Sequence, residues 1–488
     1  MRTRRAFLTV FLCALSVFAL LAASPPFAVT PEIQRALDHI SAGSLRGHLS
    51  FVASDLLEGR GTPSRGLDLA AAYVAAQFRA AGLEPAGDDG YYQTARMQSI
   101  RQNLEGFDLT LENGPQSAHA SASQAAVRSL RQANLVQVPV FRTDASAVGL
   151  LRPADVAGKA VAIALPPDET AEETVRLLAA LKPAVVLDLA WKEWPAEWLM
   201  DPSAPHLEVP WIALRDSGVL RWLRAARPGP TALRVSLRVP APSVTPFIAR
   251  NVIALLRGSD PALQSTYVLV TAHYDHLGIR RDERGGVLYP GANDDGSGTV
   301  SVIEIGQALA TLRPRPRRSI VFMTFFGEEE GSLGSLYYIH HPVFPLAKTV
   351  ADLNLEQLGR TDSSAGTETG NATLTGYDFS DLSATLRQAG RLTGVKVYRS
   401  PEGGEPYFNR SDNLTFAQHG IPAHTIVVAY EYPDYHAPGD TWQKIDYRNM
   451  ATVDRMLALA AILVADQPEP PHWNAANPKT APYRHGGD

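Results

Sequence analysis

The sequence predicts an α/β fold: a mixed, mostly parallel sheet flanked by helices, with a smaller, β-rich α/β domain inserted into it. Three observations predict it. Residues 246–466 alternate short apolar runs, typical of buried strands, with longer segments of helical periodicity. Residues 106–245 show this alternation on a smaller scale, and residues 29–105 contain an amphipathic helical segment at 67–78. Buried strands separated by helices imply an α/β sheet with helices on both faces.

The individual elements follow from local patterns of apolar residues. In the last block we expect helices at 298–312 and 450–465 and strands at 268–272, 319–326, 349–355 and 421–429. In the middle block we expect a helix at 172–182 and strands at 160–165, 184–189 and 209–214. This block has no converging set of His, Asp and Glu, so we expect it to be non-catalytic. Residues 467–488 are rich in Pro and Asn, which indicates a flexible tail.

The first residues have the pattern of a secretory signal peptide. Three arginines at positions 2, 4 and 5 precede an uncharged apolar run from Ala6 to Ala23, which ends at Ser24-Pro25-Pro26. We therefore expect a cleaved signal peptide over 1–28 and a secreted or periplasmic protein. The alternative is an uncleaved N-terminal anchor, because the run is nearly long enough to span a bilayer. Only in that case would the protein associate with a membrane.

Composition excludes several classes of protein. The chain has 45 Lys and Arg against 50 Asp and Glu, which gives a net charge of −5 and argues against a nucleic-acid-binding protein. Its only cysteine, Cys13, lies in the predicted signal peptide. A disulfide framework, a zinc site made of cysteines and an iron–sulfur cluster are therefore excluded. Any metal site must be built from histidines and carboxylates.

Five segments place metal-binding residue types at the ends of predicted strands, where sites gather in open α/β sheets. They are His273–His276, Gly291–Gly298, Gly327–Gly331, Asn354–Glu356 and Tyr435–Asp440. Each alone is compatible with an ordinary structural role, such as a solvated loop, a turn or an acidic first helical turn. Together they supply histidines and carboxylates without cysteine, which suits zinc or another divalent metal in a hydrolytic site. One carboxylate shared between two His and carboxylate pairs would make a two-metal site.

Three details strengthen the interpretation as a metal site. Alternation along an extended segment puts His273 and Asp275 on the same side, so that Asp275 can orient the imidazole. The adjacent carboxylates of Asp294 and Asp295 repel one another unless a cation lies near them. The three glutamates at 328–330 follow a very apolar strand and would be costly there without a positive partner.

This arrangement resembles the co-catalytic zinc aminopeptidases of peptidase family M28. The resemblance rests on five motifs in matching order: HYDH at 273–276, GANDDGSG at 291–298, GEEEGSLGS at 327–335, NLEQLG at 354–359 and YHAPGDT at 435–441. Residues 54–62 also resemble the family's N-terminal segment. The resemblance implies a zinc-exopeptidase fold of the phosphorylase/hydrolase-like type, with the peptidase domain formed by 29–105 and 246–466. The insertion at 106–245 is similar to a protease-associated domain.

The resemblance also implies two Zn²⁺ ions per chain, with other divalent metals as alternatives. His273 and Glu356 would bind one ion, Glu329 and His436 would bind the other, and Asp294 would bridge both. The family usually has Asp where this chain has Glu356, so the metal preference or the geometry is expected to differ.

The remaining implied roles concern catalysis and substrate. Glu328 would be the general base, and Asp275 would orient His273. Tyr435 and Tyr430 are candidates for a phenol that stabilises the oxyanion. The family usually has His where this chain has Asn413, which affects an expected substrate contact.

The expected function is an aminopeptidase that hydrolyses N-terminal residues from peptides or proteins with free N-termini. The alternatives on the same scaffold are a carboxypeptidase, a dipeptidase or a glutaminyl cyclase. A non-catalytic, receptor-like homologue is a further alternative. Such a protein should have lost a ligand or the base, and the sequence retains all of them.

Overall fold

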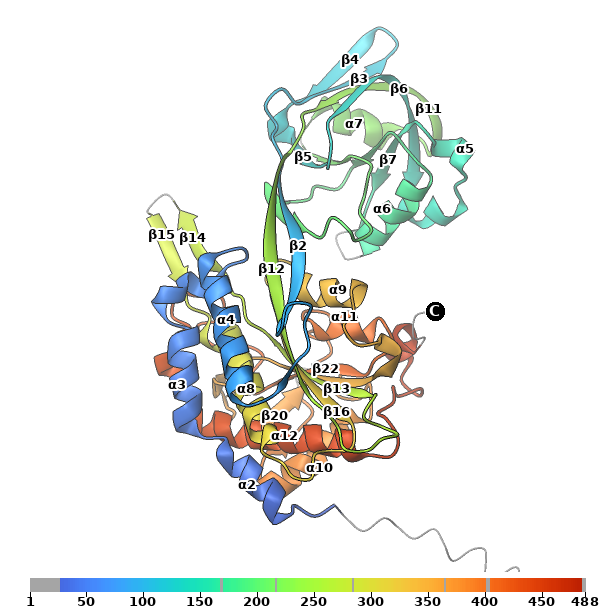
Figure 1. Ribbon diagram of the computed structural model, residues 1–488. Helices are drawn as coiled ribbons and strands as arrows, with labels where there is room; N and C mark the ends of the chain where they lie inside the picture. Colours follow the sequence, from blue (N-terminus) through green and yellow to red (C-terminus); the bar gives the residue numbers. More distant parts are fainter. Residues whose placement is uncertain are drawn as a thin grey trace, which may run out of the picture.

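The computed structural model consists of two lobes joined by two long strands, β2 (Tyr92–Arg101) and β12 (Ser243–Leu256) (Figure 1). It describes residues 27–166, 170–215, 217–282, 285–363, 366–400 and 404–484. The signal peptide expected over 1–28 lies almost entirely outside these residues. Within them we find no helix whose length and hydropathy would let it cross a lipid bilayer.

The larger lobe is built on a mixed sheet whose centre is parallel. The parallel strands are β13 (Tyr267–His273), β16 (Ser319–Phe325), β17 (Thr349–Leu355) and β22 (Ala423–Val427). Antiparallel strands flank them, with β12 against β16 and β20 (Asn371–Leu374) against β22. The order across the sheet is β21 (Lys396–Val397), β20, β22, β17, β13, β16, β12, β2 and β9 (Glu197–Met200), and β1 (Glu84–Pro85) also pairs with β12.

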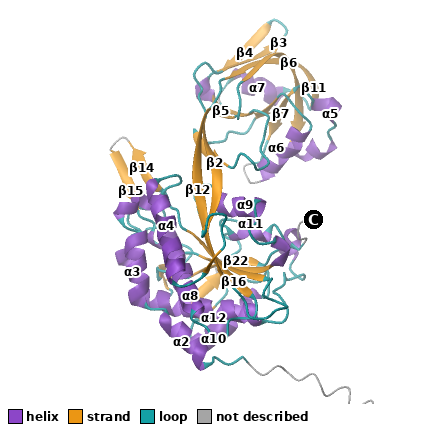
Figure 2. Ribbon diagram, viewed as in Figure 1, coloured by secondary structure: helices purple, strands orange, loops and turns teal. Residues whose placement is uncertain are grey.

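Helices cover both faces of this sheet, which confirms the predicted α/β class (Figure 2). One core contains Val268 and Val270 of β13 together with α8 (Gly298–Ala310) and α12 (Tyr447–Asp466). The same core includes residues of α2 (Pro31–His39), α3 (Ala42–Val52), α4 (Arg65–Ala80) and α10 (Leu382–Thr393). Leu269 points to the opposite face and packs with residues of α9 (Leu333–His340) and α11 (Asn413–Ala417). The strand is apolar at successive positions because both of its faces are buried.

The smaller lobe has its own sheet and its own core. The sheet runs in the order β4 (Gln116–Ala120), β3 (Asp108–Asn113), β11 (Gly229–Val239), β6 (Ala133–Asp144), β7 (Ala160–Ala164), β8 (Val185–Asp188), β10 (Trp211–Leu214) and β5 (Ala125–Arg128). Three helices accompany it: α5 (Pro153–Val156), α6 (Thr170–Ala180) and α7 (Gly218–Ala225). Two apolar clusters, one containing Leu187 and the other Val186, show that β8 is buried on both faces.

The insertion contributes a strand to the larger sheet, which the sequence did not lead us to expect. Strand β9 lies between β8 and β10 in the chain but pairs with β2, with Met200 opposite Gln98 and Glu197 opposite Arg101. Nearby, Asp201 lies 3.4 Å from the Nε2 of His341, just beyond α9. The insertion is therefore attached to the larger lobe through β9 as well as through β2 and β12.

The C-terminal segment differs from the flexible tail that we expected over 467–488. Residues 467–484 pack against the larger lobe, and Thr480 is fully buried. The indole of Trp473 donates to the carbonyl of Gly420 over 3.0 Å, and its ring contacts Phe408 and Tyr483. The Pro and Asn content led us to predict a flexible tail and to overlook the aromatic side chains of this segment. Their packing buries enough apolar surface to order an irregular segment.

Candidate metal centre

The predicted site residues converge at the carboxyl edge of the parallel strands. His273 is the last residue of β13 and is paired with Phe325, the last residue of β16. Glu328 and Glu329 follow β16 within four residues, and Glu356 directly follows β17. Neighbouring parallel strands end at the same edge of a sheet, so residues far apart in the sequence meet there.

Asp294 lies between two histidines. One carboxylate oxygen, Oδ1, is 3.3 Å from the Nε2 of His273, and the other, Oδ2, is 3.0 Å from the Nε2 of His436. Asp294 belongs to the irregular turn Ala292–Ser297 that leads into α8, and its peptide bond to Asp295 is cis. Each oxygen faces a different imidazole, which is the arrangement that a bridging ligand requires.

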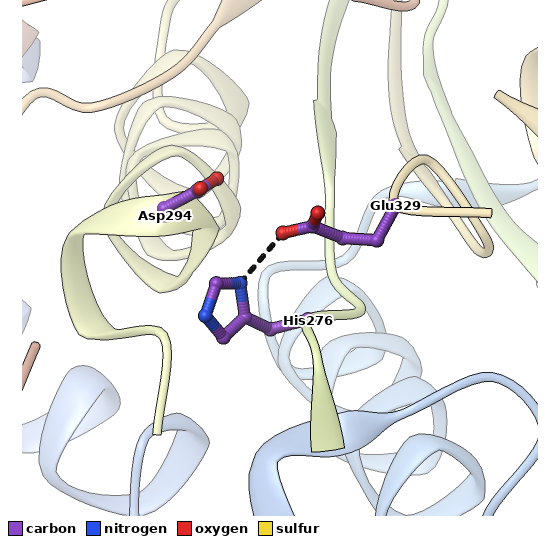
Figure 3. Close-up of side chains that lie close together, drawn as sticks. All are labelled: His276, Asp294 and Glu329. Atoms are coloured by element: carbon purple, nitrogen blue, oxygen red, sulfur yellow. Dashed lines mark ion pairs between the residues drawn. The ribbon is translucent and has the colours of Figure 1, made fainter. Parts of the chain in front are cut away.

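Glu329 also lies between two histidines. Its Oε2 is 3.3 Å from the Nε2 of His436, and its Oε1 is 2.7 Å from the Nδ1 of His276. Figure 3 shows the His276 ring with Nδ1 directed at Glu329 and with Asp294 on the far side of the site. One ligand atom each from His276, Asp294 and Glu329 lie within 4.8 Å of one another.

Asp275 supports His273 and Glu328 together. Its Oδ1 lies 3.5 Å from the Nδ1 of His273 and accepts a hydrogen bond of 3.1 Å from the backbone amide of Glu328. The carboxylate of Glu328 is 4.0 Å from the Nε2 of His273, beside the site but farther away than Asp294. The alternation argument therefore placed Asp275 on the correct side of the chain.

Glu356 is held more by its own neighbours than by the histidines. Its Oε1 accepts hydrogen bonds from the Nδ2 of Asn354, over 3.1 Å, and from the hydroxyl of Ser411. In the part of the chain that the structure describes, no ion pair within 4.0 Å joins it to His273. Of the five predicted ligands, Glu356 is the one that the structure places least directly at the centre.

The carboxylates of the site fall into two groups by their pKa. Burial alone would raise the pKa of Asp294, but the hydrogen-bonded His273 and His436 outweigh it and lower the pKa. The pKa of Glu329 is likewise lowered, because His276 and His436 outweigh burial and the nearby Asp294. Burial raises the pKa of Glu328 well above its usual value, and the nearby carboxylates, including Glu356, add to this effect against the pull of His273. Environments that separate the pKa values of neighbouring carboxyls are typical of acid–base sites.

Two buried residues that we did not predict brace the loops around Asp294. Asp440 accepts hydrogen bonds from the backbone amides of Asn293 and Asp294, at 3.0 and 3.1 Å, and from the hydroxyl of Tyr432. Arg60 is fully buried and belongs to the segment 54–62.

The guanidinium of Arg60 joins three segments of the chain. It donates hydrogen bonds of 2.7–2.8 Å to the carbonyls of Val52, Tyr274, Pro290 and Gly291. Burial lowers the pKa of Arg60 to about 10, against the opposing effect of Asp275 and other carboxylates of the site, so Arg60 is still a cation at neutral pH. The only sequence signal for this role was the resemblance of 54–62 to a family segment.

A small, partly open cavity adjoins the centre. Its lining includes Glu356 and Arg410 together with three tyrosines, Tyr407, Tyr430 and Tyr435. Tyr435 stacks on the imidazole of His436 with ring centroids 4.1 Å apart, and Tyr430 stacks on Tyr407 at 4.6 Å. Both predicted tyrosines therefore line the cavity, and Tyr435 also contacts His436.

Asn413, where a histidine was expected from the resemblance, has a structural role here. It is fully buried, its Nδ2 donates to the carbonyl of Phe408 over 3.1 Å, and its Oδ1 accepts from the hydroxyl of Thr425 over 2.8 Å.

The donor set and its spacing fit divalent metal ions. Two ligand atoms about 2.0–2.1 Å from a tetrahedral zinc ion lie about 3.3 Å apart. The three contacts of Asp294 with His273 and His436 and of Glu329 with His436 measure 3.3, 3.0 and 3.3 Å. Imidazole nitrogens and carboxylate oxygens are the ligands of zinc in hydrolytic sites. The residues around Asp294 thus fit a centre for zinc or another divalent metal.

Comparison with known proteins shows that the chain is similar to metal-dependent peptidases. Residues 251–461 match the model of Peptidase family M28. The aminopeptidase YwaD of Bacillus subtilis (strain 168) is 28% identical over 199 residues, which are 40% of this chain and 40% of that protein. The probable glutamate carboxypeptidase AMP1 of Arabidopsis thaliana is 28% identical over 231 residues, 45% of this chain and 31% of that protein. The chain thus spans less than half the length of either relative.

A solved structure extends the likeness to both lobes. The aminopeptidase from Aneurinibacillus sp. strain AM-1 aligns with a TM-score of 0.55 and 19% sequence identity, over 90% of this chain and 97% of that chain. At 19% sequence identity, this comparison shows a similar fold and nothing further.

Proposed function

The chain belongs to peptidase family M28 through its residues 251–461, and on that premise we propose that it is a zinc-dependent aminopeptidase that releases N-terminal residues from peptides. The observation that carries the proposal is the position of Asp294, with one carboxylate oxygen toward His273 and the other toward His436. His273 and Glu356 would hold one ion, and Glu329 and His436 the other. When bound, such ions polarise a carbonyl and lower the pKa of a water molecule.

In this proposal, Glu328 moves the proton. Its carboxylate takes the proton from the attacking water and then donates it to the leaving amine. Burial and the neighbouring carboxylates raise the pKa of Glu328, which favours holding a proton between the two transfers. The bond from its backbone amide to Asp275 fixes the start of its side chain relative to His273. Tyr435, stacked on His436, is positioned to steady the oxyanion.

The substrate would be a peptide with a free N-terminus. The carboxylates around the centre outnumber its histidines, so a protonated α-amine is attracted to them. A second candidate is a carboxypeptidase, because Arg410 lines the adjoining cavity and could bind a substrate carboxylate.

We further propose, from the sequence pattern of the first 28 residues, that the protein is secreted or periplasmic. From the pattern of residues 106–245, we propose that its insertion is a protease-associated domain.

The experiment that tests the function is a substrate panel with purified protein. Peptides with free ends are compared with N-blocked and C-amidated versions, and aminoacyl-p-nitroanilides report on the N-terminal specificity. An aminopeptidase cleaves the free and C-amidated peptides, and N-blocking abolishes cleavage. Activity should disappear with a chelator and return with zinc. Loss of cleavage on C-amidation, with N-blocked peptides still cut, would identify a carboxypeptidase. Full activity in protein shown by metal analysis to hold no divalent ion would contradict the mechanism.

A further inference from the structure

We propose that His276 positions Glu329: the Nδ1 of its imidazole lies 2.7 Å from the Oε1 of Glu329, and this contact reserves the Oε2 of that carboxylate for the ion shared with His436. The inference rests on the proposed function, because it concerns the same metal centre. His276 is the second histidine of the motif at 273–276 and has no role among the residues assigned from the sequence.

Two distances distinguish a positioning residue from a ligand. The Oε2 of Glu329 is 3.3 Å from the Nε2 of His436, which matches the separation of about 3.3 Å between two atoms bound to one tetrahedral zinc ion. The Oε1 of Glu329 is 2.7 Å from the Nδ1 of His276, which is too short for two ligands of one ion. The two oxygens of Glu329 therefore face two different histidines.

Both ring nitrogens of His276 are buried, and neither has a hydrogen-bond partner among the residues that the structure describes. The approach of Nδ1 to the Oε1 of Glu329 at 2.7 Å is therefore an electrostatic contact rather than an aligned hydrogen bond. This contact is one of the causes that lower the pKa of Glu329.

Packing holds the ring of His276 in this orientation. The side chain is fully buried, and its backbone amide donates to the carbonyl of Arg60 over 3.3 Å. Gly291 lies against the ring, since a Cβ at this position would be 2.3 Å from the Cγ of His276. The ring cannot move toward Gly291 without displacing the turn that carries Asp294. A fixed partner of this kind orients a carboxylate ligand, and losing such partners typically costs about 10–100-fold in metal affinity.

The test is a metal titration of the full chain, stripped with a chelator and refilled with Zn²⁺ against a chromophoric competitor. The variants are His276→Ala, which removes the ring that contacts Glu329, and His276→Asn, whose amide nitrogen can take the place of Nδ1 beside Oε1. His419→Ala is the control, because His419 is a partly buried imidazole outside the centre that bonds the carbonyl of Thr415. We expect His276→Ala to weaken one of the two binding steps by about 10–100-fold. His276→Asn should recover most of that loss, and the control should leave both steps unchanged.

A cobalt titration separates positioning from ligation. At saturating Co²⁺, the visible absorption of His276→Asn should match that of the parent protein, because no bound atom has been removed. If both variants lose a binding step and the saturated spectrum changes, His276 is a ligand and the proposal is wrong. If His276→Ala binds both ions as the parent does, the contact with Glu329 has no positioning role. Failure of the parent protein to bind any ion would instead overturn the proposed function.

Discussion

The backbone amide of Glu328 donates a hydrogen bond of 3.1 Å to the carboxylate of Asp275. The same carboxylate oxygen lies 3.5 Å from the Nδ1 of His273, so one buried group fixes both a candidate ligand and the candidate base. Asp275 is fully buried, and the hydroxyl of Thr62 reaches its other oxygen at 3.4 Å. Asp275 therefore links the position of Glu328 to that of His273.

Asp275→Asn should lower kcat by about 10–100-fold, the usual loss when the carboxylate that supports a histidine ligand is removed. The asparagine oxygen can still accept from the amide of Glu328, but the negative charge that supports His273 is gone. Steady-state kinetics at saturating zinc measures the effect. A kcat within twofold of the parent value would show that Asp275 has no orienting role.

Glu328→Gln should lower kcat by at least about 100-fold, because a carboxamide cannot take the proton from the attacking water. The matched control is Glu330→Gln, which changes the exposed glutamate two residues along the same turn and should keep most of the activity. Zinc content should be the same in both variants. If the two variants had equal activity, Glu328 would not be the general base.

Arg60→Met should destabilise the protein by about 3 kcal/mol or more, since it leaves the carbonyls of Val52, Tyr274, Pro290 and Gly291 without their buried donor. Urea unfolding measures this change. Arg65→Met removes an arginine at the start of α4 and should have little effect. Equal unfolding midpoints for the two variants would contradict the bracing role of Arg60.

His424 should make stability depend on pH below neutrality. It is fully buried between the carbonyl of Thr375 and the hydroxyl of Ser380, and burial lowers its pKa to about 4. A histidine with a usual pKa of about 6.5 takes up its proton in the unfolded chain first. Stability from this group is therefore complete above about pH 6.5 and is lost as the pH falls toward 4, by about 2.5 kcal/mol at pH 4.5.

The measurement is the free energy of unfolding at several pH values for the parent protein and for His424→Gln. The free energy of unfolding of the parent should fall relative to that of the variant as the pH drops from 7 to about 4.5. Parallel curves for the two proteins over that interval would show that His424 does not titrate as we expect.

Much of the fold could be predicted because its central strands are buried on both faces. The strand at 349–355 was predicted with its observed ends, and the strands near 268 and 319 were predicted to within one residue at each end. Strand β9 escaped prediction, because Glu197–Met200 has no run of apolar residues and becomes a strand only by pairing with β2. The packing of residues 467–484 was missed for a similar reason, since the partly buried Trp473 packs only against distant parts of the chain.

The sequence by itself determined the residue types of the centre and their order, because His273, Glu328 and Glu356 each lie at or just after the end of an apolar strand and parallel strands end at one edge. Only the tertiary structure decided where His276 and Arg60 lie. Alternation along a strand assigns His276 to the side away from His273, but the chain turns after β13 and brings its ring to Glu329. Arg60 has the charge of an exposed loop residue and is buried because carbonyls more than 200 residues away accept its protons. The sequence pattern of a segment shows which side chains the segment contains. Their interaction partners come from distant segments, and the local pattern does not specify those contacts.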